Sequence, residues 1–298
     1  MTLWDPPIDV SLRNRRGGAI AVTSLCGLTG AAAGLLLRPG CEPSGHESRN
    51  LGRVRLRDDL PPLLRSHLDL DGDGWVPRMD THAMWSRPYM RRGSLPPLPL
   101  RMRSVSRVGE SFVNDIEMVW YGRPVLRVID AFVDGRGITR IGPKAVLGEE
   151  IDQGANLFLW SEAFFVPSAF REGTPVAAEQ VGTDEIRLSV PFGAGRDSAT
   201  VRFADGHPSR FSALRYKKVG QPKIWWHVDD LKWFVKEGIA VPQRIEVTWE
   251  DERKPWLSFN LDGFAANVEA EPRLRQVSEL ISNHDRKIHE RTRDDQAT

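Results

Sequence analysis

The sequence predicts a mainly β protein with few helices: a curved antiparallel sheet or half-barrel of about ten strands, closed by an apolar helix and preceded by an N-terminal transmembrane helix. Hydrophobic residues alternate with polar ones in many segments between residues 112 and 261, which indicates strands with one face on a core. Residues 152–165 are instead apolar at helical spacing. Residues 17–37 form an uncharged run.

The N-terminal run at residues 17–37 has about the length of a helix that spans a hydrocarbon core. Residues 1–16 before it form a basic segment. We interpret the run as a single-pass membrane anchor, and a cleaved signal segment or a buried soluble helix are the alternatives. Residues 38–59, rich in Pro, Gly, Ser, Glu and Arg, are predicted to be a linker. Cys26 and Cys41 lie outside the patterned region, so no disulfide framework supports the fold.

One β-rich domain is predicted from residue 60 to 270, starting with a short helix at 60–68. Residues 112–120 read as a strand, and residues 125–133 as a strand that is apolar on both faces. Further strands of a meander are expected at 186–190, 201–203, 211–216, 224–228, 245–249 and 257–261. The tail at 271–298 is predicted to be a polar, loosely docked helix with one apolar stripe, formed by Leu274, Val277, Leu280 and Ile281.

The helix at 152–165 is the natural cover for an open sheet. Asp152 is predicted to be its N-cap, and Leu157, Trp160 and Phe164 share one face. Much of the remaining circumference is apolar too, so the helix should be buried or face a membrane or a ligand. Ten tryptophans are many for 298 residues. We predict a cavity for an apolar ligand, lined by Trp120, Leu157, Trp160, Phe164 and Trp226. The alternative is that these side chains fill a solid core.

A run of acidic residues resembles a calcium loop. Asp69, Asp71, Asp73 and Asp80 occupy loop positions one, three, five and twelve, with Gly74 at position six. Pro77 stands where the loop should enter a second helix, and no paired loop exists. We therefore favour an Asp/Gly turn between a helix and a strand over a calcium site.

Three charged residues form a possible polar site: Arg127, Asp130 and Glu162. A carboxylate in an apolar helix is costly to bury alone, so Glu162 should either face water or meet an arginine such as Arg127. The sequence contains no nucleophile elbow, phosphate loop, dinucleotide fingerprint or His-x-x-x-His pair, so we predict no catalytic residue, no metal and no cofactor. A net charge of +1 gives no overall field that would attract nucleic acid.

Several short motifs resemble one uncharacterised bacterial family, a domain of unknown function. They occur in family order over about residues 60–268, and they include Asp115–Trp120, Ile151–Asn156, Leu159–Ala163, Ala213–Tyr216 and Val247–Asp251. The resemblance implies one N-terminal hydrophobic helix followed by a β-rich domain. More distantly, the domain resembles the half-barrel of periplasmic lipoprotein carriers, in which helices close the concave side over an apolar cavity.

These observations together favour a membrane-tethered binding module for an apolar ligand, either a membrane lipid or a lipidated partner. One alternative is a hydrolase-like enzyme that uses carboxylates near Glu162 and Asp130. The other is a structural scaffold without a cavity. A pocket of several hundred cubic ångströms on the concave face would separate binding from scaffolding.

Overall fold

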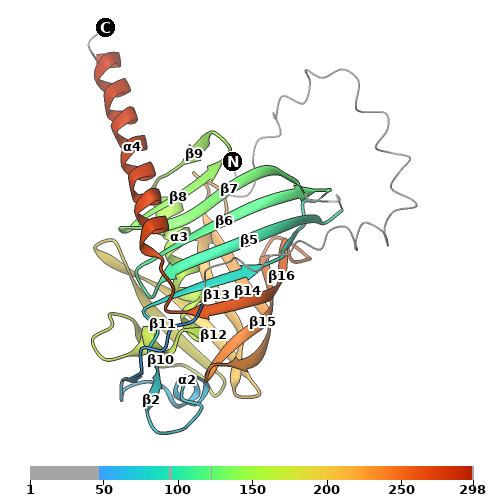
Figure 1. Cartoon of the computed structure of the whole chain (residues 1–298), viewed down its shortest axis with the longest axis vertical. Helices are drawn as coiled ribbons and strands as arrows, with labels where there is room; N and C mark the ends of the chain where they lie inside the picture. The colour runs from blue at the N-terminus through green and yellow to red at the C-terminus, as the bar shows by residue number, and fades with distance from the viewer. Residues whose placement is uncertain (1–46, 94–95, 122, 297–298) are drawn as a thin grey trace.

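A computed structural model of the chain describes residues 47–93, 96–121 and 123–296. About half of these residues lie in antiparallel strands (Figure 1). The strands are β1 (Arg53–Arg55), β2 (Trp75–Pro77), β3 (Thr81–Ser86), β4 (Tyr89–Met90), β5 (Leu98–Arg107), β6 (Ser111–Trp120), β7 (Arg123–Val133), β8 (Arg136–Ile141), β9 (Lys144–Val146), β10 (Ala177–Gln180), β11 (Glu185–Phe192), β12 (Gly195–Ala204), β13 (His207–Tyr216), β14 (Lys223–Lys236), β15 (Ile239–Trp249) and β16 (Leu257–Ala266). The helices are α2 (Pro62–Leu68), α3 (Glu149–Ser161) and α4 (Glu271–Gln296), with 3-10 turns η2 (Ala163–Phe165) and η3 (Pro167–Phe170).

Two meanders joined edge to edge make one 14-stranded sheet. One meander runs from β10 to β16 and the other from β5 to β9, and β3 pairs with both β16 and β5 to connect them. The predicted curved antiparallel sheet is confirmed, but the expected ten strands are too few. Elements such as β4, β9 and β10 are only two to four residues long, too short to show a two-residue alternation.

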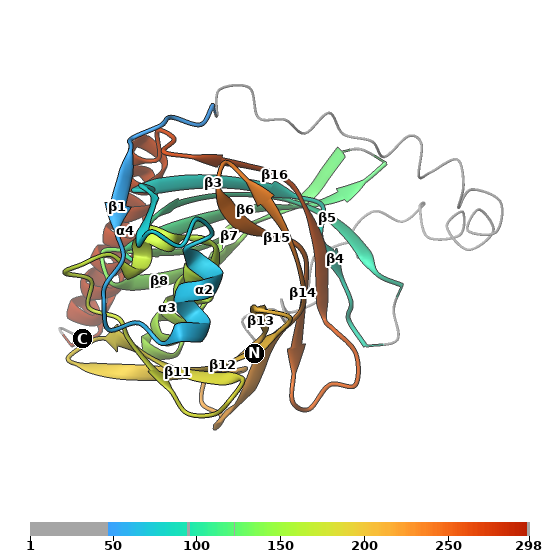
Figure 2. The same cartoon turned by 90° about the horizontal axis from the view of Figure 1, so that it is seen from below.

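The chain crosses between the two meanders through α3, which lies on the inside of the curved sheet (Figure 2). It contacts β7 and β8 of one meander and β11 and β13 of the other. The predicted closing helix is therefore confirmed. It ends at Ser161, earlier than predicted, because the backbone tightens into η2.

The predicted N-cap role of Asp152 is wrong. The N-cap of α3 is Gly148, and the Asp152 carboxylate accepts a hydrogen bond from the backbone N–H of Gly137 in β8 at 2.6 Å. A side chain at position 137 would not fit, because its Cβ would lie 2.8 Å from the carbonyl oxygen of Ile151. The helix and the strand are thus in direct backbone contact.

Helices cover both faces of the sheet at β6 and β7. Phe112 and Phe132 pack against α3 on the concave face, whereas Val113 and Ala131 pack against α4 on the convex face. Strand neighbours point to opposite faces, so both sets of side chains must be apolar. This arrangement explains the apolar residues on both faces at the end of the 125–133 segment, whereas Val125 at its start is 55% exposed.

The tail helix α4 is docked more firmly than predicted. Leu274, Val277 and Ile281 are buried against the convex face, and Leu280 is partly buried there. In addition, the Arg273 guanidinium donates a hydrogen bond to the Asp115 carboxylate at 2.9 Å. The expected stripe is confirmed, and its docking follows from the apolar outer face of β6 and β7.

The predicted basic segment and transmembrane helix, residues 1–16 and 17–37, lie outside the described residues. Among the helices that the structure does describe, none is long and apolar enough to cross a bilayer. Part of the predicted linker at 38–59 is packed: β1 pairs with β2, and Leu56 is fully buried beside Arg171.

Helix α2 is held inside the curve by a buried histidine. Nε2 of His67 lies 2.8 Å from the carbonyl oxygen of Phe164. Its Nδ1 lies 2.8 Å from Nδ1 of His207. The His67 imidazole also meets the ring of Trp233 edge-on, with centroids 4.6 Å apart. Burial lowers the pKa of His67 from 6.5 to about 4, although the bond to Phe164 opposes the shift. His67 is therefore neutral at neutral pH.

Acid should weaken the fold through His67. Since its folded-state pKa of about 4 lies below the unfolded value of 6.5, the unfolded chain binds the proton first as the pH falls. The stability contributed by the neutral ring is complete above pH 6.5 and is lost towards pH 4. The full loss is about 3 kcal/mol. Urea unfolding across this range should show a flatter pH dependence for His67→Gln than for the unmodified protein. An equally steep fall in His67→Gln would contradict this origin.

Docking of α4 should be measurable as well. Leu274→Ala removes a buried side chain and is expected to lower the free energy of unfolding by about 2–5 kcal/mol. Glu279→Ala on the exposed side of the same helix should stay within about 0.5 kcal/mol of the unmodified protein. Urea denaturation measures both. Equal stabilities of the two variants would mean that the helix contributes nothing to the fold.

Candidate functional site

Four of the five predicted ligand-binding residues lie together inside the curve. Leu157 and Trp160 from α3, Phe164 from η2 and Trp226 from β14 belong to one buried hydrophobic cluster. Each has at most 2% of its surface exposed. The sequence thus placed these side chains on the interior correctly, but most of them are packed against neighbours.

Trp120 does not join this cluster, and the prediction that it lines the interior is wrong. Its side chain is 51% exposed, and its ring meets that of Tyr121 at a centroid distance of 5.4 Å. It is the last residue of β6, beyond a register shift between Met118 and Val119 in the pairing with β7. The strand pattern continues to this residue, but the sheet there extends past the core.

A small cavity of about 30 Å³ remains between α3 and the concave face of the sheet. Its walls are mainly apolar and come from both meanders. They include Leu100, Met102, Ile116, Phe158, Trp226, Val247, Trp256, Leu257 and Phe259. Three polar side chains, Asn114, Asp130 and Arg215, also reach it. The cavity is therefore an apolar space with a polar group set into its wall.

Arg215 of β13 is the buried cation of this site. Only 3% of its surface is exposed, and its guanidinium lies over the rings of Trp226 and Trp249 at 4.9 and 5.9 Å. Burial lowers its pKa to about 10, although Asp130 opposes the shift. Gly154 of α3 makes room for it, since a Cβ there would lie 2.6 Å from the guanidinium Nε. That Nε has no hydrogen-bond partner.

Asp130 of β7 supplies the opposing charge. Burial raises its pKa, while Arg215 and a 2.8 Å hydrogen bond from the Thr139 hydroxyl oppose the rise. Its partner across the strands is Asn114, whose side-chain oxygen is buried without a hydrogen-bond partner. The indole N–H of Trp226 is also unpartnered. Unpaired buried polar atoms are costly, and the three residues that carry them here, Asn114, Arg215 and Trp226, line the cavity.

The predicted polar site of Arg127, Asp130 and Glu162 is not assembled. Arg127 lies on the surface and pairs with Glu117 at 3.2 Å, so the proposed contact with Glu162 is wrong. Arg127 meets Glu117 because the strand register places the two residues opposite each other on β7 and β6.

Glu162 is instead buried beside His82 and Ser106. One of its carboxylate oxygens lies 3.3 Å from Nε2 of His82 and accepts a hydrogen bond from the Ser106 hydroxyl at 3.3 Å. The contact with His82 is poorly aligned for a hydrogen bond. The space beside this group is only about 10 Å³, and the serine donates to the carboxylate, not to the histidine. This geometry is not that of a nucleophilic triad.

The acidic loop is an Asp/Gly turn, as favoured from its sequence. The carboxylate of Asp69 accepts hydrogen bonds from the backbone N–H groups of Gly72 and Gly74, at 2.9 and 2.7 Å. Arg53 binds Asp71 and Asp73 at 3.0 and 2.8 Å. Asp80 pairs with arginines elsewhere. Within the described ranges, no three His, Cys, Asp or Glu side chains are grouped so as to hold a metal.

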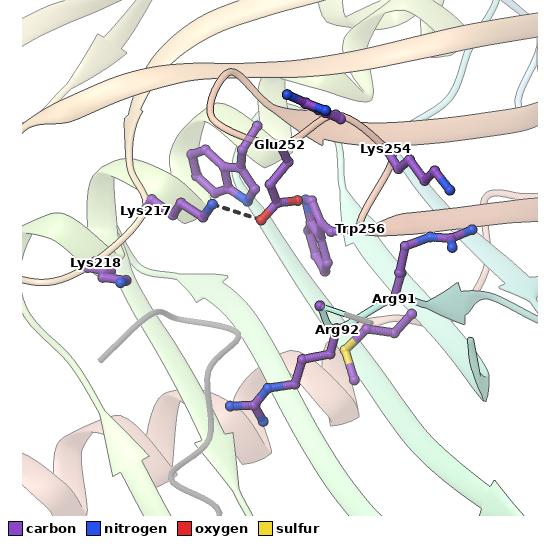
Figure 3. Close-up of a pocket in the computed structure, with 11 residues that line it drawn as sticks. Arg91, Arg92, Lys217, Lys218, Glu252, Lys254 and Trp256 are labelled. Atoms are coloured by element: carbon purple, nitrogen blue, oxygen red, sulfur yellow. Dashed lines mark hydrogen bonds and ion pairs between the residues drawn. The ribbon is translucent and has the colours of Figure 1, made fainter. Parts of the chain in front are cut away.

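An open groove of about 460 Å³ adjoins the interior cavity, and Trp256 lines both. Three loops form it: the segment after β4, the β13–β14 turn and the β15–β16 turn. Six basic side chains and one acidic side chain line it: Arg91, Arg92, Lys217, Lys218, Arg253, Lys254 and Glu252 (Figure 3). No local pattern in the sequence predicts this basic groove. Its only signal is three pairs of adjacent basic residues, which are distant in sequence.

The buried charges should be energetically coupled. Arg215→Met or Asp130→Asn alone leaves one buried group without its opposite charge, and each should lower the free energy of unfolding by about 3 kcal/mol. The double variant should lose much less than the sum. Urea denaturation of all four proteins gives the coupling energy.

The exposed pair Glu117 and Arg127, on the same sheet, is the matched control. Its double-mutant cycle with Glu117→Gln and Arg127→Gln should give about 1 kcal/mol or less, because water screens the pair. Additive losses at Arg215 and Asp130 would show that the two buried groups do not interact.

Three solved structures are similar to this chain. A LolA superfamily protein from Nitrosomonas europaea is 9% identical, with a TM-score of 0.42, over 65% of this chain and 89% of that chain. A putative outer membrane lipoprotein-sorting protein domain from Vibrio parahaemolyticus is 9% identical, with a TM-score of 0.41, over 72% and 96%. A DUF1329 family protein from Desulfovibrio piger is 13% identical, with a TM-score of 0.38, over 69% and 91%.

Comparison with curated proteins gives no match. The sequence profile of DUF6544, a family of unknown function, matches residues 53–261. This range agrees with the span of about 60–268 over which the motifs resemble a family of unknown function. Since the match covers more than half of the 298 residues, the chain belongs to the DUF6544 family.

Proposed function

We propose that this protein is a binding module for an apolar ligand, a lipid or a lipidated partner, which it holds between the concave face of the sheet and α3. The tether in this proposal is the uncharged run at residues 17–37, which would anchor the chain in a membrane. That part of the proposal rests on the sequence.

The observation that carries the proposal is the cavity beside Arg215. Its walls are apolar, yet Arg215 Nε, Asn114 Oδ1 and Trp226 Nε1 are buried there without hydrogen-bond partners. A scaffold stabilised only by packing has no use for unpaired polar atoms in its core. Apolar walls with a few polar groups are typical of ligand sites, where the polar groups fix one end of the ligand.

The interior space is small in this structure. A space of about 30 Å³ has room for roughly one water molecule and is far smaller than a typical ligand pocket of about 300 Å³ or more. An acyl chain must therefore displace side chains as it enters. Trp256 lines both the cavity and the open groove, so in this proposal the acyl chain enters past its indole.

The enzyme alternative finds less support. Asp130 and Glu162 have different partners and line different small cavities. General acid-base chemistry needs two such groups on one substrate. A binding role uses the same buried residues without that requirement.

Tryptophan fluorescence tests the proposal directly. A neutral stearoyl monoglyceride with a brominated chain should quench the full-length protein saturably, because bromine quenches an indole only in contact. Trp226→Phe should lose much of the quenched signal, since Trp226 lines the cavity. Trp75→Phe should keep it, because Trp75 is 47% exposed in β2 and does not line the cavity.

Two results would contradict an interior site. One is the absence of saturable quenching. The other is equal quenching in Trp226→Phe and Trp75→Phe, which would place the brominated acyl chain on the protein surface.

A further inference from the structure

We infer that the basic groove binds the phosphate head group of an anionic lipid whose chain occupies the interior cavity. The inference rests on the proposed function and adds the chemical class of the ligand. It assigns separate roles to two adjoining spaces, an apolar cavity for the chain and a charged groove for the head group.

The charge of the groove is local and does not reflect the whole chain. The chain has 41 basic and 40 acidic residues, whereas the groove is lined by six basic residues and one acidic residue. Three separate loops contribute two basic residues each. Such a concentration of positive charge in a concave, partly desolvated site attracts an anion more strongly than scattered surface charges do.

The single acidic side chain of the groove is engaged at one edge. Glu252 accepts a hydrogen bond from the Lys217 ammonium at 2.7 Å, and Asp251 accepts another at 2.6 Å. In Figure 3, Lys217 and Lys218 lie on one side of Trp256, whereas Arg91 and Lys254 lie on the other. The acidic groups therefore offset the charge of Lys217, whereas Arg91 and Lys254 lie on the other side of Trp256.

The base of the groove is aromatic, which suits a lipid better than a free anion. Trp249 and Trp256 are both buried and line it. The ring centroid of Trp249 lies 5.8 Å from the Lys217 ammonium and 5.9 Å from the guanidinium carbon of the buried Arg215. A rim of cations above an apolar floor matches a phosphate attached to a hydrocarbon chain, because each part of the lipid meets its own kind of surface.

The geometry also connects head group and chain. Trp256 forms a wall of both spaces, and the backbone N–H of Arg91 donates to the Trp256 carbonyl at 2.7 Å. The backbone of Arg91 is thereby held beside Trp256. A phosphate bound near Arg91 and Lys254 would leave its chain at the indole of Trp256.

Competition for the cavity tests the inference. The full-length protein is loaded with the neutral brominated monoglyceride, and recovery of tryptophan fluorescence reports displacement from the interior. Dioctanoyl phosphatidylglycerol should displace it at about tenfold lower concentration than dioctanoylglycerol, which has the same chains without phosphate. Arg91→Gln with Lys254→Gln should abolish this advantage and leave displacement by dioctanoylglycerol unchanged.

The matched control removes the same amount of charge elsewhere. Lys144→Gln with Arg187→Gln changes exposed residues of β9 and β11 that do not line the groove, and it should keep the tenfold advantage. Inorganic phosphate is titrated separately by calorimetry.

The outcomes separate the two proposals. Loss of the advantage only in the groove variant supports the head-group site. Equal displacement by both lipids in the unmodified protein overturns it while the apolar site stands, and calorimetric binding of inorganic phosphate in that case would assign the groove to free phosphate. A monoglyceride that never quenches the protein overturns the proposed function itself.

Discussion

The seating of α3 inside the curved sheet is the constraint on which the rest of the structure depends. The helix touches β8 so closely that position 137 must be glycine, and Gly154 leaves just enough space for Arg215 on the opposite meander. One helix therefore fixes the distance between the two halves of the sheet. That distance sets the small size of the interior cavity and brings Asp130 of β7 into the electrostatic range of Arg215 of β13.

The convex and concave faces of the sheet are covered by different kinds of side chain. On the convex face, α4 covers β6 and β7 with an apolar stripe and needs no polar group at its centre. On the concave face, aromatic packing is interrupted by a buried cation and its carboxylate. Two opposite charges buried in a core are seldom its most stable solution, so their presence at the cavity favours a role in binding a ligand.

The interior cavity and the basic groove differ in polarity and share Trp256 as a lining residue. Arg215 and Lys217 are separated by one residue of the chain, and both approach Trp249, one from inside the core and one from the groove. The surface thus changes from apolar walls to aromatic floor to cationic rim within a few residues. Amphiphilic ligands have the same order of chemistry along their length, which is why the two spaces are best understood together.

Local pattern by itself determined much of this protein. Alternation at Ile186, Leu188 and Val190 predicted a strand whose inner residues are fully buried, and helical spacing predicted that Leu157 and Trp160 would face the core. Both features depend only on neighbours in the sequence. The membership in a family of unknown function was likewise recognisable from the order of short motifs.

Only the tertiary structure decided which charges and aromatics meet. The sequence suggested Arg127 as the partner of Glu162, but strand register turns Arg127 to the surface, and the buried cation of the core is Arg215. Trp120 follows an apolar pattern yet projects beyond the core. The groove unites three basic pairs from distant loops. Burial and electrostatic pairing depend on contacts between distant segments, and no local periodicity encodes those contacts.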